Sequence, residues 1–317
     1  MPRTLALTGA TGFIGTALRR RLVSAGWEVR ALHRRRASQP RYGSDDTRIR
    51  WVCGSLSDPD SLRRLLQGVA AVVHCAGAVR GASAEQFNQV NVEGVARLVQ
   101  AARELHPVPR FLLISSLAAR EPALSFYAAS KRGGEGILHT LAGPMETTIF
   151  RPPAVYGPGD REMAPLLRCM QHGLAPVLGG SAARFSLLCV EDLADAIRHA
   201  LERPDWAPGP FEIHDGHPEG YSWEEVMTTV SRILRRPVRA VRVPLALLRA
   251  AAAGNLLLAQ ICGTLPMLTP GKVRELTHPD WVCHDAPLRE ATGWTPHIGL
   301  EEGMRLTIDA LGTDRDD

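Results

Sequence analysis

The sequence predicts an α/β fold with a doubly wound, mostly parallel sheet and a smaller C-terminal lobe. Three observations predict it. Short apolar runs, typical of buried strands, alternate with stretches whose apolar residues recur at helical spacing. A glycine-rich turn joins the first of these strands to the first helix. Beyond residue 155, proline and glycine become frequent between shorter pieces, which indicates a second and less regular unit.

The first strand, turn and helix occupy the start of the chain. Thr4 to Thr8 form a short apolar strand, and Gly9, Gly12 and Gly15 follow at three-residue spacing, with helical periodicity beginning at Ile14. The first glycine permits a tight turn, the second lets backbone approach a pyrophosphate, and the third lets the helix pack on the strand. N–H groups at the helix start attract phosphate. The unit predicts a Rossmann dinucleotide site, and the lack of a following Gly-Lys-Ser/Thr excludes a P-loop.

The end of the second strand, residues 28–32, bears on the choice of cofactor. NAD sites usually place an acid here to bind the ribose 2′-hydroxyl. This chain has His33 followed by Arg34, Arg35 and Arg36, and guanidinium groups suit a 2′-phosphate. We therefore expect NADP and, less readily, NAD, with Arg34 on the phosphate and Arg35 or His33 assisting. At least one of the three arginines is expected to lie in a solvated loop.

Further strands and helices complete the first domain. Strands are expected at residues 48–54, 71–75, 111–116 and 147–151, and helices from residue 59, from residue 90 and over residues 125–141. Small residues Ala76 and Gly77 would let the chain pass beneath the cofactor. His74 is expected to pack in the sheet because it has no partner at motif spacing. Asn91 is expected to bond to backbone of a neighbouring strand.

Three side chains suggest proton-transfer chemistry. Ser116 lies at the carboxyl end of its strand, where open α/β sheets bind ligands, and Tyr127 and Lys131 share one helix face four residues apart. A tyrosine works near neutral pH only if its pKa falls, and a nearby ammonium favours the phenolate. The serine would hold the substrate oxygen beside the phenol. Ser115 is the alternative to Ser116.

A rigid turn over residues 152–159 is expected to lead out of the sheet. Beyond it we expect helices at 163–170, 190–201, 221–234, 245–262, 271–276 and 300–311, with strands at 184–188, 211–213 and 238–243. Residues 1–155 would form the nucleotide domain, to which elements from about 184–215 return. Residues 156–317 would form the substrate lobe.

The apolar run Leu245 to Cys262 reaches the lower end of a membrane-spanning length. Arg249, Gly254 and Asn255 interrupt it. We therefore expect a buried or pocket-lining helix and no membrane span. A helix that rests on a membrane surface is the alternative.

Composition bounds the remaining possibilities. The chain has 317 residues, 45 % of them apolar and 22 % charged, so it can build a normal core. A net charge of +4, spread along the chain, argues against a nucleic-acid partner. No metal site is expected. Six cysteines without a C-x-x-C pair predict free, buried thiols in a reducing cytoplasm, and we expect no signal peptide before the first strand.

Several motifs together resemble the extended short-chain dehydrogenase/reductase family. They are TGATGFIG, VVHCAG, ISSLAA, YAASK and RPPAVYGPGD, with VEDLADAI and GWTPHIGLEEGMRLT in the second half. The resemblance covers nearly the whole chain and is nearest the hydroxysteroid dehydrogenases and dihydroflavonol reductases. It implies that Ser116, Tyr127 and Lys131 are catalytic. The cofactor residues that it implies are Gly9, Thr11, Gly12, Phe13, Ile14, Gly15, His33, Arg34, Arg35, Leu56, Cys75, Ala76, Gly77, Asn91, Ser115, Tyr127, Lys131, Pro152 and Val155.

The chain departs from the family pattern in two places. Many members have Gly-Asp-Leu after the third strand, whereas this chain has Gly54-Ser55-Leu56, so an acid contact to adenine loses its basis. Ser116 lies closer to Tyr127 than in typical sugar-nucleotide epimerases, which removes a loop that often touches substrate. A homodimer through the helices at residues 91–104 and 125–141 is a family expectation.

Three hypotheses about function follow. The first is an NADP-dependent oxidoreductase that interconverts an alcohol and a ketone or aldehyde on a lipophilic or aromatic small molecule. The second is a sugar-nucleotide epimerase or dehydratase, whose diphosphate Arg161, Arg168 and Arg184 could bind. The third is a non-catalytic NADP-sensing protein, which the intact Ser116 and Tyr127 argue against.

Overall fold

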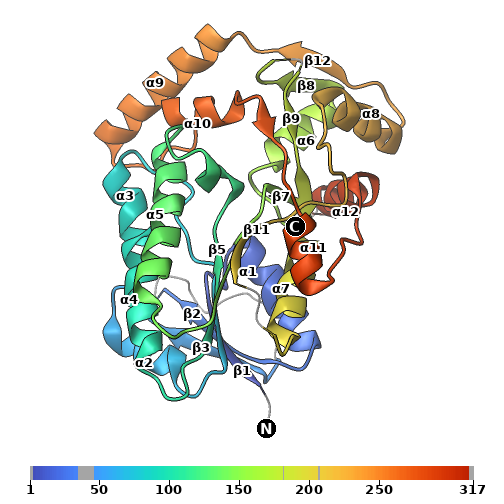
Figure 1. Cartoon of the computed structure of the whole chain (residues 1–317). Helices are drawn as coiled ribbons and strands as arrows, with labels where there is room; N and C mark the ends of the chain where they lie inside the picture. Colours follow the sequence, from blue (N-terminus) through green and yellow to red (C-terminus); the bar gives the residue numbers. More distant parts are fainter. Residues whose placement is uncertain (1–2, 35–45, 181, 206–207, 314–317) are drawn as a thin grey trace.

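A seven-stranded sheet, every pairing of which is parallel, forms the centre of the computed structural model (Figure 1). The structure describes residues 3–34, 46–180, 182–205 and 208–313. The strand order is β11-β6-β5-β4-β1-β2-β3. These strands are β1 (Thr4–Thr8), β2 (Glu28–His33), β3 (Ile49–Cys53), β4 (Ala71–His74), β5 (Arg110–Ile114), β6 (Thr147–Arg151) and β11 (Gly209–Glu212). The order reverses between β1 and β4, and ligands of such sheets bind at the carboxyl ends there.

Helices cover both faces of this sheet, which confirms the predicted doubly wound α/β fold (Figure 1). One face packs against α1 (Phe13–Ser24) and α7 (Val190–Glu202). The other packs against α2 (Pro59–Leu66), α4 (Glu93–Arg103) and α5 (Phe126–Leu141). Each sheet face therefore contributes to its own apolar core.

The helix expected from residue 90 is two helices. α3 (Ala84–Asn91) begins earlier, where the Ser83 side chain accepts a hydrogen bond from the Gln86 backbone N–H, and α4 starts after a break at Val92. Ser83 with Gln86 is a helix-start pattern that periodicity alone did not reveal. The start expected before residue 59 is correct, because Asp58 caps α2 by accepting from the Asp60 N–H.

The second half of the chain builds the smaller lobe from short strands and helices. Its described helices are α6 (Ala164–Gln171), α8 (Trp223–Leu234), α9 (Leu245–Cys262), α10 (Pro270–Leu276), α11 (Ala286–Thr292) and α12 (Leu300–Thr313). Its described strands form the pairs β7 (Ala154–Tyr156) with β10 (Leu187–Cys189), β8 (Leu174–Val177) with β12 (Arg239–Arg242), and β9 (Arg184–Phe185) with β13 (Asp280–Trp281). The expected turn after β6 therefore contains a strand, β7.

Two elements of the second half return to the nucleotide domain. β11 pairs with β6, and α7 packs against α1. Asp195 of α7 binds Arg21 of α1 and accepts a hydrogen bond from Trp294 Nε1 at 3.2 Å. The two halves of the chain are thus interleaved.

The apolar helix α9 has the predicted bounds. It was predicted to be buried or to line a pocket, and burial is wrong. Only Ala252 and Ala259 are buried. It lies along the edge of the lobe with α10 beside it (Figure 1). By length and composition it is the one described helix that could cross a membrane. An apolar helix is normally buried, and here none of the described residues covers the outer side of α9.

The six cysteines are all free, as predicted, but their burial is mixed. Cys189 and Cys283 are buried, whereas three others are exposed: Cys53, Cys169 and Cys262. Local apolar sequence therefore did not decide the burial of these thiols.

Candidate active site

The glycine-rich turn packs tightly against the end of β4. Gly9 has φ +69°, and a Cβ there would lie 2.6 Å from the Ala76 backbone nitrogen. A Cβ on Gly15 would overlap the Gly9 carbonyl oxygen. Gly12 begins α1 with no side-chain cap, and the first turn of α1 carries no acid. The N-terminus of this helix therefore fits the diphosphate of a dinucleotide.

Asn91 fixes the chain segment that follows β4. Its Oδ1 accepts from the Ala78 N–H at 2.8 Å, and its Nδ2 donates to the Ala78 carbonyl at 3.0 Å and to Ser130 Oγ at 2.8 Å. Asn91 therefore bonds to this loop and to α5, whereas the sequence predicted a bond to the backbone of a neighbouring strand. Asn91 is buried, and its hydrogen bonds hold the loop after β4 against α5.

His74 is packed in the sheet, as predicted. It is fully buried, and its Nδ1 lies 2.7 Å from the Thr8 hydroxyl, which also accepts from the Ala76 N–H at 3.2 Å. Burial, with a smaller effect of the Lys131 charge, lowers the pKa of His74 to about 3. The imidazole is therefore neutral near physiological pH and holds the ends of β1 and β4 together.

The structure separates the two serines at the end of β5. Ser115 is buried and donates to Glu135 Oε1 at 2.6 Å, and Glu135 in turn binds the Arg151 guanidinium through both of its oxygens. Ser116 lies on the opposite side of the backbone, caps the turn η1 (Leu117–Arg120), and hydrogen-bonds the Tyr127 hydroxyl. Ser116 is therefore the serine beside the candidate proton donor.

Tyr127 is half-buried in the first turn of α5, and its ring meets Phe87 edge-on with centroids 6.1 Å apart. Burial raises the pKa of Tyr127 to about 12; the hydrogen bond with Ser116 opposes this rise and the Glu275 charge adds to it. The expectation that Lys131 lowers this pKa is not met in this state. The phenol is protonated at neutral pH and can donate a proton.

Lys131 lies one turn after Tyr127 on α5. Its ammonium donates to the Ile114 carbonyl, at the end of β5, at 2.9 Å. Burial lowers the pKa of Lys131 to about 8, against the opposing effects of Cys75 and Glu135. A small hollow beside it is lined by residues from the ends of β4 and β5 and from α3, α4 and α5: His74, Ala76, Asn91, Val95, Leu113, Ser115, Lys131 and Gly134.

Helix α10 contributes charges that sequence reasoning missed. Buried Glu275 accepts a hydrogen bond from Ser125, the residue that caps α5, and pairs with Lys272 at 2.9 Å. The Lys272 ammonium lies 5.9 Å from the centroid of the Tyr127 ring. Lys272 and Glu275 are three residues apart in a helix that begins after Thr269, with Pro270 as its first residue. This spacing in the sequence could have predicted that the two side chains pair.

The end of β2 carries the residues on which the cofactor choice rests. His33 packs edge-on against Trp51, with ring centroids 5.6 Å apart, and Arg34 follows it and is exposed. Arg34 forms no ion pair within the described ranges, and Arg35 lies outside them. Leu56 packs into the core against α4, beside Gly94.

The other predicted cofactor residues gather at the same edge of the sheet. Thr11 is exposed in the glycine turn, while Phe13 and Ile14 are half-buried at the start of α1. Pro152 follows β6 and accepts a hydrogen bond from the Leu117 N–H at 2.8 Å. Cys75 follows β4, and Val155 lies in β7, half-buried. The glycine turn, Cys75 and Pro152 thus follow the carboxyl ends of β1, β4 and β6, whereas Leu56 packs into the core and Val155 lies in β7 of the lobe.

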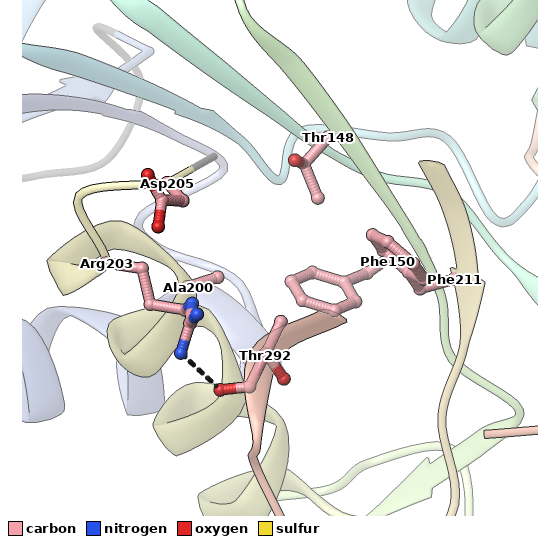
Figure 2. Close-up of a pocket in the computed structure, with 7 residues that line it drawn as sticks. All are labelled: Thr148, Phe150, Ala200, Arg203, Asp205, Phe211 and Thr292. Atoms are coloured by element: carbon pink, nitrogen blue, oxygen red, sulfur yellow. Dashed lines mark hydrogen bonds between the residues drawn. The ribbon is translucent and has the colours of Figure 1, made fainter. Parts of the chain in front are cut away.

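A second hollow lies elsewhere and contains none of the predicted site residues. Figure 2 shows it between α7, β6 and β11, lined by Thr148, Phe150, Ala200, Arg203, Asp205, Phe211 and Thr292. Arg203 Nη1 donates to the Thr292 carbonyl there at 2.8 Å. This hollow has no part in the site around Tyr127.

Comparisons with known proteins show which sequences and folds this chain resembles. The model of the NAD dependent epimerase/dehydratase family matches residues 5–213. A ceramide reductase of Caulobacter vibrioides is 37 % identical over 96 % of this chain and 93 % of its own length. A 2-alkyl-3-oxoalkanoate reductase of Stenotrophomonas maltophilia is 26 % identical over 94 % and 96 %. A Bacillus cereus UDP-glucuronic acid 4-epimerase solved with NAD superposes with TM-score 0.76 and 17 % identity, covering 98 % of this chain and 99 % of that one.

Proposed function

This chain belongs to the NAD-dependent epimerase/dehydratase family, within the extended short-chain dehydrogenases/reductases, and we propose that it is an NADP-dependent reductase of a ketone on a long-chain lipid. It is an NAD(P)-dependent oxidoreductase. A lipid substrate is supported by two relatives named for lipophilic substrates, a ceramide and an alkyl-oxoalkanoate. We infer a ceramide-class substrate, a long-chain amide whose ketone becomes a hydroxyl.

Two relatives named as reductases support the proposal that the chain works as a reductase, and a protonated Tyr127 fits this direction. Reduction of a ketone needs a group that gives up a proton as the oxygen gains charge. With its pKa raised to about 12, Tyr127 holds that proton at neutral pH.

Each side chain has a separate task in this reaction. Bound NADPH would supply the hydride. The Ser116 hydroxyl would hold the substrate oxygen, and the adjacent Tyr127 hydroxyl would protonate it as the carbonyl becomes an alcohol. Lys131, charged at neutral pH, would support the phenolate that remains. Helix α10 would shield the phenol from water through the Ser125–Glu275 contact.

The choice of NADP is supported by the exposed Arg34 and by the lack of an acid at the end of β2. Arg34→Asp is expected to weaken NADPH binding by about 1.5–3 kcal/mol, the scale of a charge-assisted hydrogen bond. NADH binding should change far less. Titration calorimetry with both nucleotides measures this, and a wild-type preference for NADH would refute the NADP assignment.

Sugar-nucleotide epimerisation is the alternative from the same family. It requires cations for a diphosphate, yet Arg184 already donates to the Glu219 and Gly220 carbonyls at 2.7 Å. An epimerase retains its nucleotide through each cycle, whereas a reductase exchanges it. Purified protein should therefore bind added NADPH readily and leave UDP-sugars unchanged. A full, non-exchanging complement of nucleotide would favour the epimerase.

A further inference from the structure

The outer side of α9 is apolar and uncovered. At about 100° per residue, its four most prominent side chains fall opposite the buried Ala252 and Ala259. They are 60–74 % exposed: Leu247, Leu257, Leu258 and Ile261. Arg249 is exposed between this side and the buried side, about 80° from the nearest of these four side chains. An exposed apolar stripe of this length on a described helix marks an interaction surface.

The chain around α9 is strongly basic. From Val226 to Arg274 the sequence has eight arginines and lysines and no aspartate or glutamate, although the whole chain has 33 acids. Arg239 and Arg242 stand exposed on β12, directly before α9, and Arg249 is exposed on α9 itself. Among the described residues, these three arginines have no ion-pair partner. The surface therefore combines apolar and cationic groups, the pattern of helices that lie in an anionic membrane interface.

The connections of α9 favour lying on a bilayer over crossing it. Before the helix, Val243 N–H donates to the Val177 carbonyl of β8 at 3.3 Å. On its inner side, Asn255 Nδ2 donates to the Leu268 carbonyl at 2.8 Å, and α10 follows directly. A spanning helix would place its two ends on opposite sides of the membrane. Both ends of α9 are held by the same lobe.

We propose that α9 and the arginines of β12 dock this protein on the surface of an anionic lipid bilayer. The leucines would enter the boundary between headgroups and acyl chains, and Arg239, Arg242 and Arg249 would meet the phosphates. Docking would also bring the candidate active site close to the lipid. Helix α10 packs on α9, and its Lys272 lies beside the Tyr127 ring. The docking proposal does not depend on the identity of the substrate.

Sedimentation of the full chain with vesicles tests the proposal. Wild-type protein should pellet with phosphatidylcholine vesicles that contain phosphatidylglycerol and bind pure phosphatidylcholine far more weakly. Leu258→Glu should weaken this binding at least about tenfold, because a leucine that enters the bilayer is replaced by a charge. Leu306→Glu on α12, also at an exposed leucine, is the matched control and should bind as wild type.

A second pair of variants tests the electrostatic contribution to vesicle binding. Arg239→Ser/Arg242→Ser should weaken binding by about fivefold per arginine, and added salt should abolish the difference. Arg63→Ser/Arg305→Ser removes the same charge from exposed positions on α2 and α12 and should have little effect. Thermal unfolding checks that all variants are folded.

Three outcomes would overturn docking on a bilayer. The first is wild-type protein that stays in the supernatant with both vesicle types. The second is Leu258→Glu protein that binds vesicles as well as Leu306→Glu does. The third is a wild-type dimer that Leu258→Glu converts into a monomer in sedimentation velocity without lipid, which would show that a second copy covers α9.

Discussion

At the scale of single residues, neighbouring side chains of one type have different tasks. Ser115 and Ser116 are adjacent, yet one belongs to a buried ion pair and the other contacts the phenol. The sequence indicated both serines as candidates and could not decide which one contacts Tyr127. Alternation along a strand places the two side chains on opposite faces, but it does not tell which face Tyr127 lies on. The partner of Ser115, Glu135, lies 20 residues away and became visible only in the fold.

Substitution of each serine should therefore have a distinct effect. Ser116→Ala is expected to slow turnover by about 10²-fold or more, because it removes a contact to the reacting oxygen. The lost cap of η1 should lower the free energy of unfolding by no more than about 1 kcal/mol. Ser115→Ala leaves a buried carboxylate short of a donor, which should lower the free energy of unfolding by about 1–3 kcal/mol with turnover largely kept. Urea unfolding and steady-state kinetics on both variants measure this. The reverse pattern would make Ser115 the catalytic serine.

His74 should govern part of the acid sensitivity of the fold. Its folded pKa, about 3, lies below the unfolded value of 6.5, so its contribution to stability is complete above pH 6.5 and is lost as pH falls. Below about pH 6, His74 alone should add a slope of about 1.4 kcal/mol per pH unit to the free energy of unfolding. His74→Asn should remove that slope, whatever its effect at pH 7. Parallel profiles for wild type and variant between pH 4 and 6 would refute this.

At the scale of elements, the sequence predicted the existence of most strands and helices, because periodicity and caps are local signals. α5 and α9 have nearly the predicted bounds. The burial of α9 was mispredicted because composition cannot show whether the chain provides a partner for each side. α3, β8 and α11 were missed: they are short elements with weak periodicity. The approach of α10 to Tyr127 depends on contacts 150 residues apart.

Two glycines of α5 offer a matched pair of substitutions. A Cβ on Gly134 would overlap the Asn91 carbonyl oxygen, whereas a Cβ on Gly136 meets nothing within 4 Å. Gly136→Ala should therefore stabilise the protein by about 0.5–1 kcal/mol through helix propensity. Gly134→Ala should destabilise it by separating α5 from α3, with a loss of turnover because Asn91 moves. Thermal unfolding of the two variants measures these changes in stability. Equal effects would mean that α5 does not pack closely against α3 at Gly134.

At the scale of the whole molecule, the interleaved chain sets the site between its two parts. β1, β4 and β5 end around the switch point, and α10 from the second lobe closes over Tyr127. The sequence predicted this general location, since glycine turn, serine, tyrosine and lysine have known relative places on the fold. It could not predict the protonated state of Tyr127, which depends on burial and on Glu275. The homodimer and the cytoplasmic location stay predictions.

The proposed reductase activity is measured as the reduction of a ceramide-class ketone by NADPH, with wild type and Tyr127→Phe compared. The alcohol is quantified by mass spectrometry alongside loss of NADPH absorbance. Wild-type protein should convert the ketone with one NADPH per alcohol. Tyr127→Phe keeps the ring and should lower turnover by about 10²–10⁴-fold with NADPH affinity nearly unchanged. Equal turnover by the two proteins would refute the role of Tyr127 as proton donor. Tight NADPH binding without any reduction of the ketone would refute the proposed reductase activity.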